Sequence, residues 1–370
     1  MNIPDKNTII RFFRARIAIL DAQLALIMFL IVSTGLITLY SAGIDFPGRV
    51  EDQIRNILLG FIVMWFAASV PPQVLMRFAV PIYTVGVMLL LAVALFGLVR
   101  KGARRWLNVG VIIQPSEIMK IAVPLMLAWF FQRREGKIGW HGFLAAIALV
   151  GLPTALVVRQ PDLGTALLVG AIGFYVIFLA GISWKVLVGV FVAGIASLPV
   201  VWSLLYDYQR QRVMMLIDPS SDPLGRGFHI IQSTIAIGSG GITGKGWLRG
   251  TQAYLNFIPE RTTDFIFAVY AEEFGLIGNI LLLILYSFLI ARGFMISQNA
   301  PTVFSRLLSG AITMMFFTYA FVNMGMVSGI LPVVGVPLPL MSYGGTAMVS
   351  LGLGAGILMS IQRNRRLHQT

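Results

Sequence analysis

Residues 22–44 read AQLALIMFLIVSTGLITLYSAGI, a run of 23 residues without a charged side chain. About 20 apolar residues cross the hydrocarbon core of a bilayer, so this run is long enough for one membrane-spanning helix. Further uncharged runs cover 56–76, 78–99, 142–158, 163–184, 186–206 and 274–291. With 57% hydrophobic residues among 370 and a mean hydropathy of +0.84, the chain is too apolar for a soluble domain.

Two more regions bring the expected number of spans to ten. The run 121–132 becomes long enough if its helix begins near Ser116, and the run 307–362 has room for two helices around the Pro/Gly-rich stretch 331–345. Lipid offers backbone groups no hydrogen-bond partners, and the period-two alternation of a membrane β-barrel is absent. We therefore predict an all-α polytopic membrane protein with about ten transmembrane helices. Its single domain covers 1–370, with a long extracytoplasmic loop, 206–263, between helices 7 and 8.

The distribution of Lys and Arg predicts the orientation. With ten spans both termini share one side, where the termini and short loops carry fourteen Lys and Arg, against seven in the short loops opposite. By the positive-inside rule both termini are cytoplasmic. The polar, basic N-terminus precedes a run long enough for a stable span, so no cleavable signal peptide is expected. The net charge of +13 is spread over loops on both faces, which argues against a nucleic-acid partner.

The few charged residues gather at the ends of apolar runs. Spans four, six and eight begin on the predicted exterior, at Glu117, Asp162 and Asp264. An ionisable group at bilayer depth is costly and indicates a functional site. Lys120 follows Glu117 by three residues and shares its helix face. The alternative interpretation is that Glu117 and Asp162 only cap helices and that Lys120 pairs with Glu117.

Asp264 stands between two threonines and the apolar stretch Phe265–Phe267. A carboxylate at such an edge is partly desolvated, which suits it to act as a general base. The alternative is that Asp264 caps span eight. Glu272 and Glu273 are expected two to three turns deeper, as structural partners of basic groups, and are assigned no chemistry.

The long exterior loop contains Asp207–Arg212 and a glycine-rich stretch, Gly238–Gly246. The second stretch imitates a phosphate-binding P-loop, but Ser239 replaces its first glycine and Gly246 replaces the residue that would hold magnesium. Such a loop can still present backbone N–H groups to an anion. Basic residues nearby favour a phosphate-bearing exterior ligand, although they can equally contact lipid headgroups: Arg104, Arg105, Arg210 and Arg212.

Several motifs resemble the SEDS family (shape, elongation, division and sporulation) over the whole chain and in family order. They are Gln114–Glu117 with Lys120, Gln160–Gly164, Asp207–Arg210, Thr263–Phe267 and Ser342–Gly345. The stretch Gly335–Pro339 and the short N-terminus are similar to the elongation branch of the family rather than the division branch. The resemblance implies a peptidoglycan glycosyltransferase in the cytoplasmic (inner) membrane, which polymerises lipid II during cell elongation and rod-shape maintenance. It also implies a class B penicillin-binding protein as transpeptidase partner, together with other elongation-complex proteins.

The resemblance also implies roles for individual residues. Asp264 matches the essential aspartate of the family and would remove a proton from the acceptor sugar. Glu117, Lys120 and Asp162 match its important polar positions. Lys120, with Arg210 or a divalent cation (Mg²⁺ or Mn²⁺), would stabilise the departing undecaprenyl pyrophosphate, and no organic cofactor is expected. A single displacement would invert the anomeric centre.

Two other functions remain open. A lipid II flippase would use the same cavity for passage and would need polar groups along its whole depth. An ion-coupled transporter would relay protons through Glu117, Asp162 and Asp264, and would be favoured by broken helices in an inverted repeat. The polar groups gather at the exterior end, and the sequence shows no such repeat, so the polymerase is preferred.

Overall fold

A computed structural model describes residues 20–100, 103–108, 110, 112–135, 139–205, 210–211, 213–214, 216, 226–251 and 260–367. Within this part of the chain, a helix of 17 or more residues lies in each region predicted to span the membrane. These helices are α2 (Ala22–Ala42), α3 (Arg49–Ser69), α4 (Pro72–Phe96), α5 (Pro115–Arg133), α6 (Trp140–Arg159), α7 (Leu163–Leu179), α8 (Trp184–Leu204), α12 (Ile266–Gln298), α13 (Val303–Val327) and α14 (Gly345–Leu367). A shorter helix, α10 (Arg226–Ser239), lies in the predicted exterior loop.

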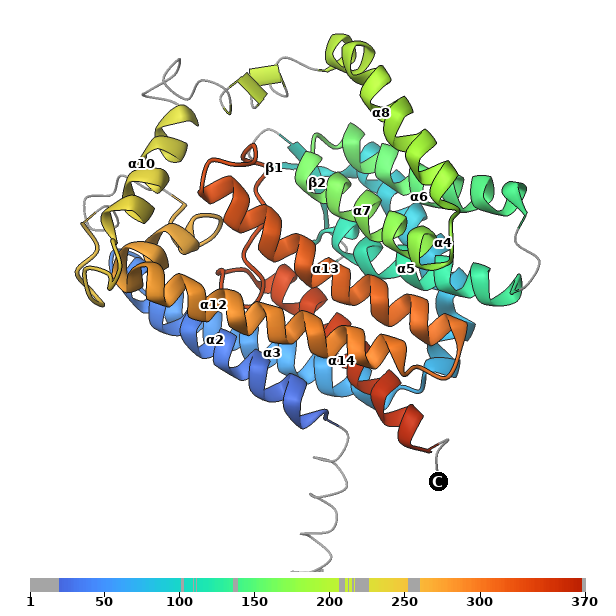
Figure 1. The fold of residues 1–370 in the computed structure, drawn as a ribbon, viewed down its shortest axis with the longest axis horizontal. Coiled ribbons are helices and arrows are strands. Elements are labelled where there is room, and N and C mark those ends of the chain that lie inside the picture. Colours follow the sequence, from blue (N-terminus) through green and yellow to red (C-terminus); the bar gives the residue numbers. More distant parts are fainter. Residues whose placement is uncertain are drawn as a thin grey trace, which may run out of the picture.

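The chain is a mostly helical, multi-pass membrane protein. In the described residues, α2, α4, α6, α12, α13 and α14 are long and apolar enough to cross a bilayer, and α7 and α8 contain shorter apolar stretches. Helices α3 and α5 carry charged residues near their first turns. In the bundle, α2 lies beside α12, α3 beside α14, and α5 between α4 and α13 (Figure 1).

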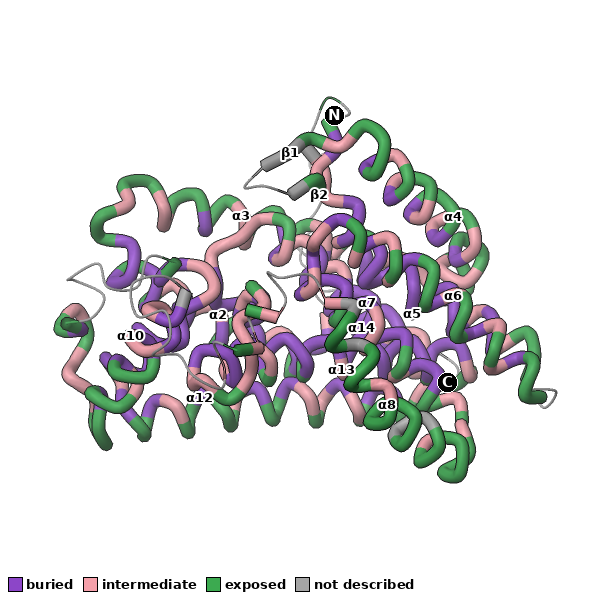
Figure 2. The backbone as a smooth tube through the Cα atoms, turned by 90° about the horizontal axis from the view of Figure 1, so that it is seen from above, coloured by how far each residue is buried: buried purple, intermediate pink, exposed green. Residues whose placement is uncertain are grey.

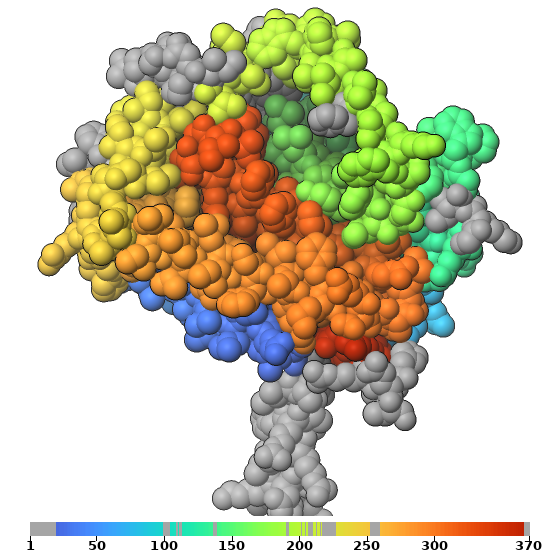
Figure 3. All heavy atoms as spheres, in the orientation of Figure 1, coloured from blue at the N-terminus to red at the C-terminus, as the bar shows by residue number. Residues whose placement is uncertain are grey.

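The core lies around α5, α13 and α14, whose residues are mostly buried, while α4 and α12 expose their outer faces (Figure 2). Helix α8 leans away from the bundle, and most of its described residues are exposed. The molecular surface is hollowed between α8 and α13, with α7 at the floor (Figure 3). The site described below is built from α5, α7, α13 and α14.

A small antiparallel sheet precedes α5. Its strands are β1 (Leu98–Arg100), β2 (Ala103–Asn108) and β3 (Ile112–Ile113), in the order β1-β2-β3. Leu98 pairs with Trp106, and Leu107 pairs with Ile113. The all-α prediction did not include this sheet, because its strands are short and rich in arginine.

Helices α3 and α14 pack with their backbones almost in contact. A Cβ atom added to Gly352 would lie 2.4 Å from the Gly60 carbonyl oxygen, and one added to Gly356 would lie 2.3 Å from that of Met64. Small residues permit such close approach of membrane helices. We call this contact, made by Gly60, Gly352 and Gly356, the glycine seam.

Helix α12 is broken near its beginning. Gly275 has φ 64° and ψ −161°, outside the helical range, so residues 266–274 form a separate helical segment. Glu272 and Glu273 lie at the end of this segment and contact the loop that follows α10. Glu272 thus lies about two turns beyond Asp264 and pairs with a basic group, Lys245, as expected, whereas the break at Gly275, just beyond both glutamates, was not expected.

Candidate functional site

Glu117 and Lys120 form an ion pair inside the bundle. Pro115 at the first position of α5 starts the helix, and the spacing of three residues places both side chains on one face. Lys120 Nζ lies 2.5 Å from Glu117 Oε1, and the side chains are 3% and 15% exposed. The ammonium also donates to the Tyr319 hydroxyl, and Ser350 Oγ donates to Glu117 Oε2 at 3.0 Å. Pairing of Lys120 with Glu117 is thus confirmed, within a network that also includes α13 and α14.

Asp162 caps α7, as the alternative interpretation proposed. Its Oδ1 accepts a hydrogen bond from the Thr165 backbone N–H at 3.2 Å. Its Oδ2 accepts one from Gln114 Nε2 at 3.3 Å and lies 3.7 Å from Arg105 Nη1. Arg105 Nη2 also donates to the Pro161 carbonyl at 2.5 Å. Asp162 therefore joins the start of α7 to strand β2 and to the residue preceding α5.

Asp264 lies in the turn before α12 and is half-buried. The N-cap residue is Phe265, and no side chain caps the helix, so capping does not account for Asp264. Its backbone carbonyl accepts a hydrogen bond from Asn323 Nδ2 at 2.8 Å. Gly335, with φ 74°, lies so close that an added Cβ would be 3.4 Å from Asp264 Oδ2. The backbone of Asp264 is held firmly, and its carboxylate faces the segment that connects α13 to α14.

Helix α13 brings Asp264 towards Lys120. Tyr319, which contacts Lys120, and Asn323, which holds Asp264, are four residues apart and therefore on one helix face. At a rise of 1.5 Å per residue they are separated by about 6 Å along the axis. The predicted grouping of Glu117, Lys120 and Asp264 thus has a geometric basis, with α13 as the common support.

The Pro/Gly-rich stretch 331–345 lies between the start of α7 and Asp264. A Cβ added to Gly164, two residues after Asp162, would be 2.5 Å from the Val334 carbonyl oxygen. Further along the stretch, Ser342 Oγ donates to the carbonyl of Thr263 at 2.6 Å. This stretch is therefore packed against α7 at one point and against the Asp264 turn at another.

Arg210 and Arg49 lie on different elements and contact different groups. Arg210 Nε and Nη2 donate to the carbonyls of Trp202 and Ser203 at 3.1 and 2.7 Å, at the end of α8. Arg49 lies with its guanidinium carbon 4.4 Å from the centre of the Tyr343 ring. The remaining motif residues Asp207, Tyr208, Gln209 and Arg212 lie outside the described residues.

His229 of α10 lies beside the start of α12. Its ring centre is 6.0 Å from that of Phe265, and its Nδ1 atom is buried without a hydrogen-bond partner. Burial lowers the pKa of His229 below its usual value, while the charge of Glu260 acts in the opposite direction. His229 is therefore neutral near pH 7 and adds no positive charge to this region.

The sequence model of the FtsW/RodA/SpoVE family, described as cell cycle protein, matches residues 17–367. The chain belongs to this family.

Curated relatives and solved structures agree with the FtsW/RodA/SpoVE assignment. The chain is 50% identical over 367 residues to the peptidoglycan glycosyltransferase MrdB of Escherichia coli, covering 98% of each chain. A solved chain from a peptidoglycan synthase complex that coordinates polymerization and crosslinking is 34% identical, with a TM-score of 0.81, covering 94% of this chain and 98% of that one. The rod shape determining protein RodA of Thermus thermophilus is 29% identical, with a TM-score of 0.71 and coverage of 94% and 97%. The predicted family and the predicted enzyme class, a peptidoglycan glycosyltransferase, are confirmed.

Sequence reasoning missed three residues of the site of this FtsW/RodA/SpoVE-family chain. They are Tyr319, Asn323 and Ser350, which hold Lys120 and Asp264 or contact Glu117. Their only signal is that polar side chains interrupt the long uncharged run 307–362. That signal is weak, because a hydroxyl in a membrane helix commonly bonds to its own backbone.

The carboxylates do not form a metal site by themselves. Among the residues that the structure describes, no three His, Asp or Glu side chains are grouped to hold an ion. Glu117 is paired with Lys120, and Asp162 faces Arg105. Glu117 and Asp162 therefore already have basic partners, and a divalent cation at this site stays a prediction.

Proposed function

We propose that this chain polymerises lipid II into glycan strands at the outer face of the cytoplasmic membrane, during cell elongation and rod-shape maintenance. The observation that carries the proposal is the half-buried Asp264, which is not the N-cap of α12 and is held by Asn323, one turn along α13 from Tyr319, the partner of Lys120. Backbone contacts with Asn323 and Ser342 of the neighbouring segments fix the turn that carries this aspartate.

Asp264 is the general base in this mechanism. The acceptor sugar hydroxyl attacks C1 of the donor sugar while its proton passes to the Asp264 carboxylate. The bond between C1 and the phosphate oxygen breaks, and undecaprenyl pyrophosphate leaves with the electron pair. One displacement inverts C1. Positive charge near the leaving group stabilises the transition state.

The basic residues at this face have two different roles: Lys120 supports the bundle, and the arginines supply positive charge to the leaving group. Lys120 is buried and already paired, so it neutralises Glu117 and keeps α5, α13 and α14 together. Arg49 and Arg105 lie nearer the predicted exterior ends of their elements, where a lipid-linked pyrophosphate would pass. Arg210 is proposed to assist from α8. A divalent cation, Mg²⁺ or Mn²⁺, would enter with the pyrophosphate, and no step here depends on it.

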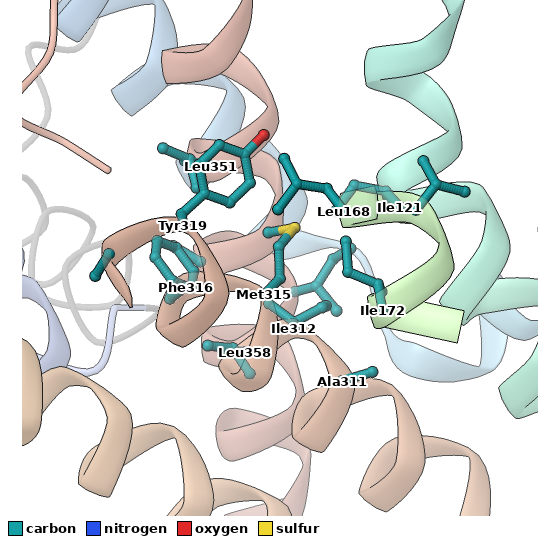
Figure 4. Packing of buried hydrophobic residues seen from close by; sticks show 14 of the residues in the cluster. Ile121, Leu168, Ile172, Ala311, Ile312, Met315, Phe316, Tyr319, Leu351 and Leu358 are labelled. Atoms are coloured by element: carbon teal, nitrogen blue, oxygen red, sulfur yellow. The ribbon is translucent and has the colours of Figure 1, made fainter. Parts of the chain in front are cut away.

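The packing below the site favours a polymerase over a flippase. Ile312, Met315 and Leu358 pack together below Tyr319 in an apolar layer (Figure 4). Further along α13, the Thr313 hydroxyl donates to the backbone carbonyl of Ser309 at 2.8 Å. Buried hydroxyls that bond to their own helix offer no polar route through the membrane.

The proposal is tested with purified protein, its partner and lipid II, by separating glycan strands on gels. Asp264→Asn keeps the shape of the side chain but removes the base, which commonly costs about 10²–10⁴ in rate. Asp264→Glu should also be impaired, because the longer arm displaces the carboxylate. Glu51→Gln removes an exposed carboxylate from α3 and serves as the control. Strand formation by Asp264→Asn at the wild-type rate would exclude the assigned base. Transport of lipid II by wild-type protein without strands would favour the flippase.

We also propose ten spans, with both termini in the cytoplasm and the loop 206–263 outside. Ser220, a natural position for a label in that loop, lies outside the described residues. Thr243 is exposed in the same loop, and Asn299 is exposed at the opposite end of α12. In this Cys-free chain, Thr243→Cys should react with an impermeant thiol reagent in spheroplasts, and Asn299→Cys only after lysis. The reverse pattern would invert the topology.

A class B penicillin-binding protein is the proposed partner, with other elongation-complex proteins. The likeness to a chain of a peptidoglycan synthase complex supports this. Small residues permit close helix approach, so Gly310 and Gly325 of α13 are candidates for a docking groove near α12 and α13. Both are buried instead: an added Cβ would lie 2.5 Å from Leu179 Cδ1 at Gly310 and 2.8 Å from Leu331 Cδ1 at Gly325. These glycines serve the packing of this chain, so co-purification is better tested with substitutions at exposed Leu281 and Phe288.

A further inference from the structure

The break in α12 separates the turn that carries Asp264 from the rest of the helix. Residues 266–274 form a segment of their own, because Gly275 departs from helical geometry. Asp264 lies directly before this segment, and Glu272 lies near its other end. The direction of the segment therefore acts together with Asn323 and Ser342 to set where the Asp264 carboxylate lies.

The loop that follows α10 supplies the hydrogen bonds that the break removes. A helix that is broken leaves backbone N–H and C=O groups without partners, and these must be paired in an apolar setting. Four backbone bonds do this: Lys245 N–H to the Glu272 carbonyl (3.0 Å), Gly246 N–H to Glu273 (3.0 Å), Leu276 N–H to Gly241 (2.9 Å) and Ile277 N–H to Ile242 (3.1 Å). The loop is thus part of the broken helix and not an independent ligand-binding loop.

The glycines of this loop are required by backbone packing. An added Cβ would lie 2.0 Å from the Glu273 carbonyl oxygen at Gly244, and 2.2 Å from that of Ala271 at Gly240. Gly244 also has φ 79°, a region that favours glycine. The stretch that imitates a P-loop in the sequence is therefore explained by its contact with α12.

Side chains fasten the same contact. Glu272 is fully buried, and its Oε1 lies 2.6 Å from Lys245 Nζ. The same oxygen accepts hydrogen bonds from the backbone N–H and the hydroxyl of Thr251, both at 2.9 Å. At the other end of the segment, His229 of α10 packs on Phe265. Helix α10 and its loop thus contact both ends of residues 265–274.

We propose that Lys245 and Glu272 are positioning residues for Asp264, through the direction of the segment 266–274. The inference rests on the proposed role of Asp264 as the base. Glu272 follows Asp264 by eight positions, a length of about 12 Å at the helical rise per residue. A tilt of about 5° at one end would move the other by about 1 Å, and a misplacement of that size can cost about 10²-fold in rate.

The test compares Lys245→Met with Arg249→Met, which removes the same charge from an exposed position of the same loop. In the strand-forming assay, Lys245→Met should lower kcat by about 10–100-fold. Its KM for lipid II should change by less than about threefold, because no substrate contact is removed. Lys245→Arg should restore most of the activity. Amides in the peptide 265–277 should exchange hydrogen faster in Lys245→Met than in wild type or Arg249→Met.

Several outcomes would overturn the proposal. They are an equal loss in Arg249→Met, a raised KM with unchanged kcat, or unchanged exchange in the peptide 265–277. If Lys245→Met does not fold, Thr251→Val removes one donor to Glu272 and the same exchange measurement applies. Inactive wild-type protein, or an active Asp264→Asn variant, would instead refute the proposed function, and the exchange result would still report on the contact.

Discussion

Replacing Lys120 by methionine tests whether its ion pair supports the fold. Lys120 is 3% exposed and Glu117 15%, so the substitution leaves a carboxylate in the bundle with Ser350 as its remaining donor. Breaking a buried pair by removing one partner costs about 3–5 kcal/mol, whereas replacing both is often nearly neutral. We therefore expect Lys120→Met to be destabilised strongly, and Lys120→Met/Glu117→Gln to recover about 2–3 kcal/mol of that loss.

Denaturation is followed in detergent, by heating the protein and measuring the fraction that remains monodisperse on gel filtration. Because such unfolding is irreversible, variants are compared at one heating rate. Lys185→Met, at an exposed position at the start of α8, is the matched control. If Lys120→Met denatures at the same temperature as Lys185→Met, the ion pair does not support the bundle as described. The same holds if the double variant is less stable than Lys120→Met.

Three further predictions concern the surroundings of the site. Asp162→Ala should lower the denaturation temperature, because loss of a cap costs about 1 kcal/mol and Arg105 loses an acidic neighbour. Asp162→Asn should keep most of the stability. An unchanged denaturation temperature for Asp162→Ala would contradict the capping role. Burial lowers the pKa of His229, so its contribution to stability is complete above its usual pKa of 6.5 and falls as the pH decreases towards the lowered value. Between pH 7 and 5, wild-type protein should therefore lose more thermal stability than His229→Gln, and parallel curves would exclude this role. Chelation by EDTA should leave the denaturation temperature unchanged, because the described residues contain no cluster of three metal ligands. Thermal destabilisation by EDTA would indicate a resident ion.

The sequence predicted the helices well because charge and length constrain a membrane chain strongly. Each uncharged run had to become a helix, and the charged residues marked the ends. The break at Gly275 was not predictable, because Glu272 and Glu273 with the residues around them fit a continuous helix equally well. The partner that makes the break favourable is a loop about 30 residues earlier in the chain, and no local pattern reports such a contact.

The acidic residues of the site were predictable from the sequence, but the residues that hydrogen-bond to them and to Lys120 were not. Glu117, Asp162 and Asp264 stood out because carboxylates are rare in this chain. Whether each was a cap or a reactive group depended on neighbours in space: Asp162 caps α7, whereas the N-cap of α12 is Phe265 and not Asp264. Tyr319 was inconspicuous among other aromatic residues, since its role appears only when α13 is packed against α5.

The glycine seam between α3 and α14 has a consequence for mutational tolerance. It touches none of the acids, yet α14 also carries Ser350, whose hydroxyl contacts Glu117. A methyl group at Gly352 would force the two helices apart, because the nearest backbone oxygen lies 2.4 Å from its position. In a saturation scan of the whole chain, these glycines should therefore be as intolerant of substitution as Glu117 and Lys120, although they contact none of the acids.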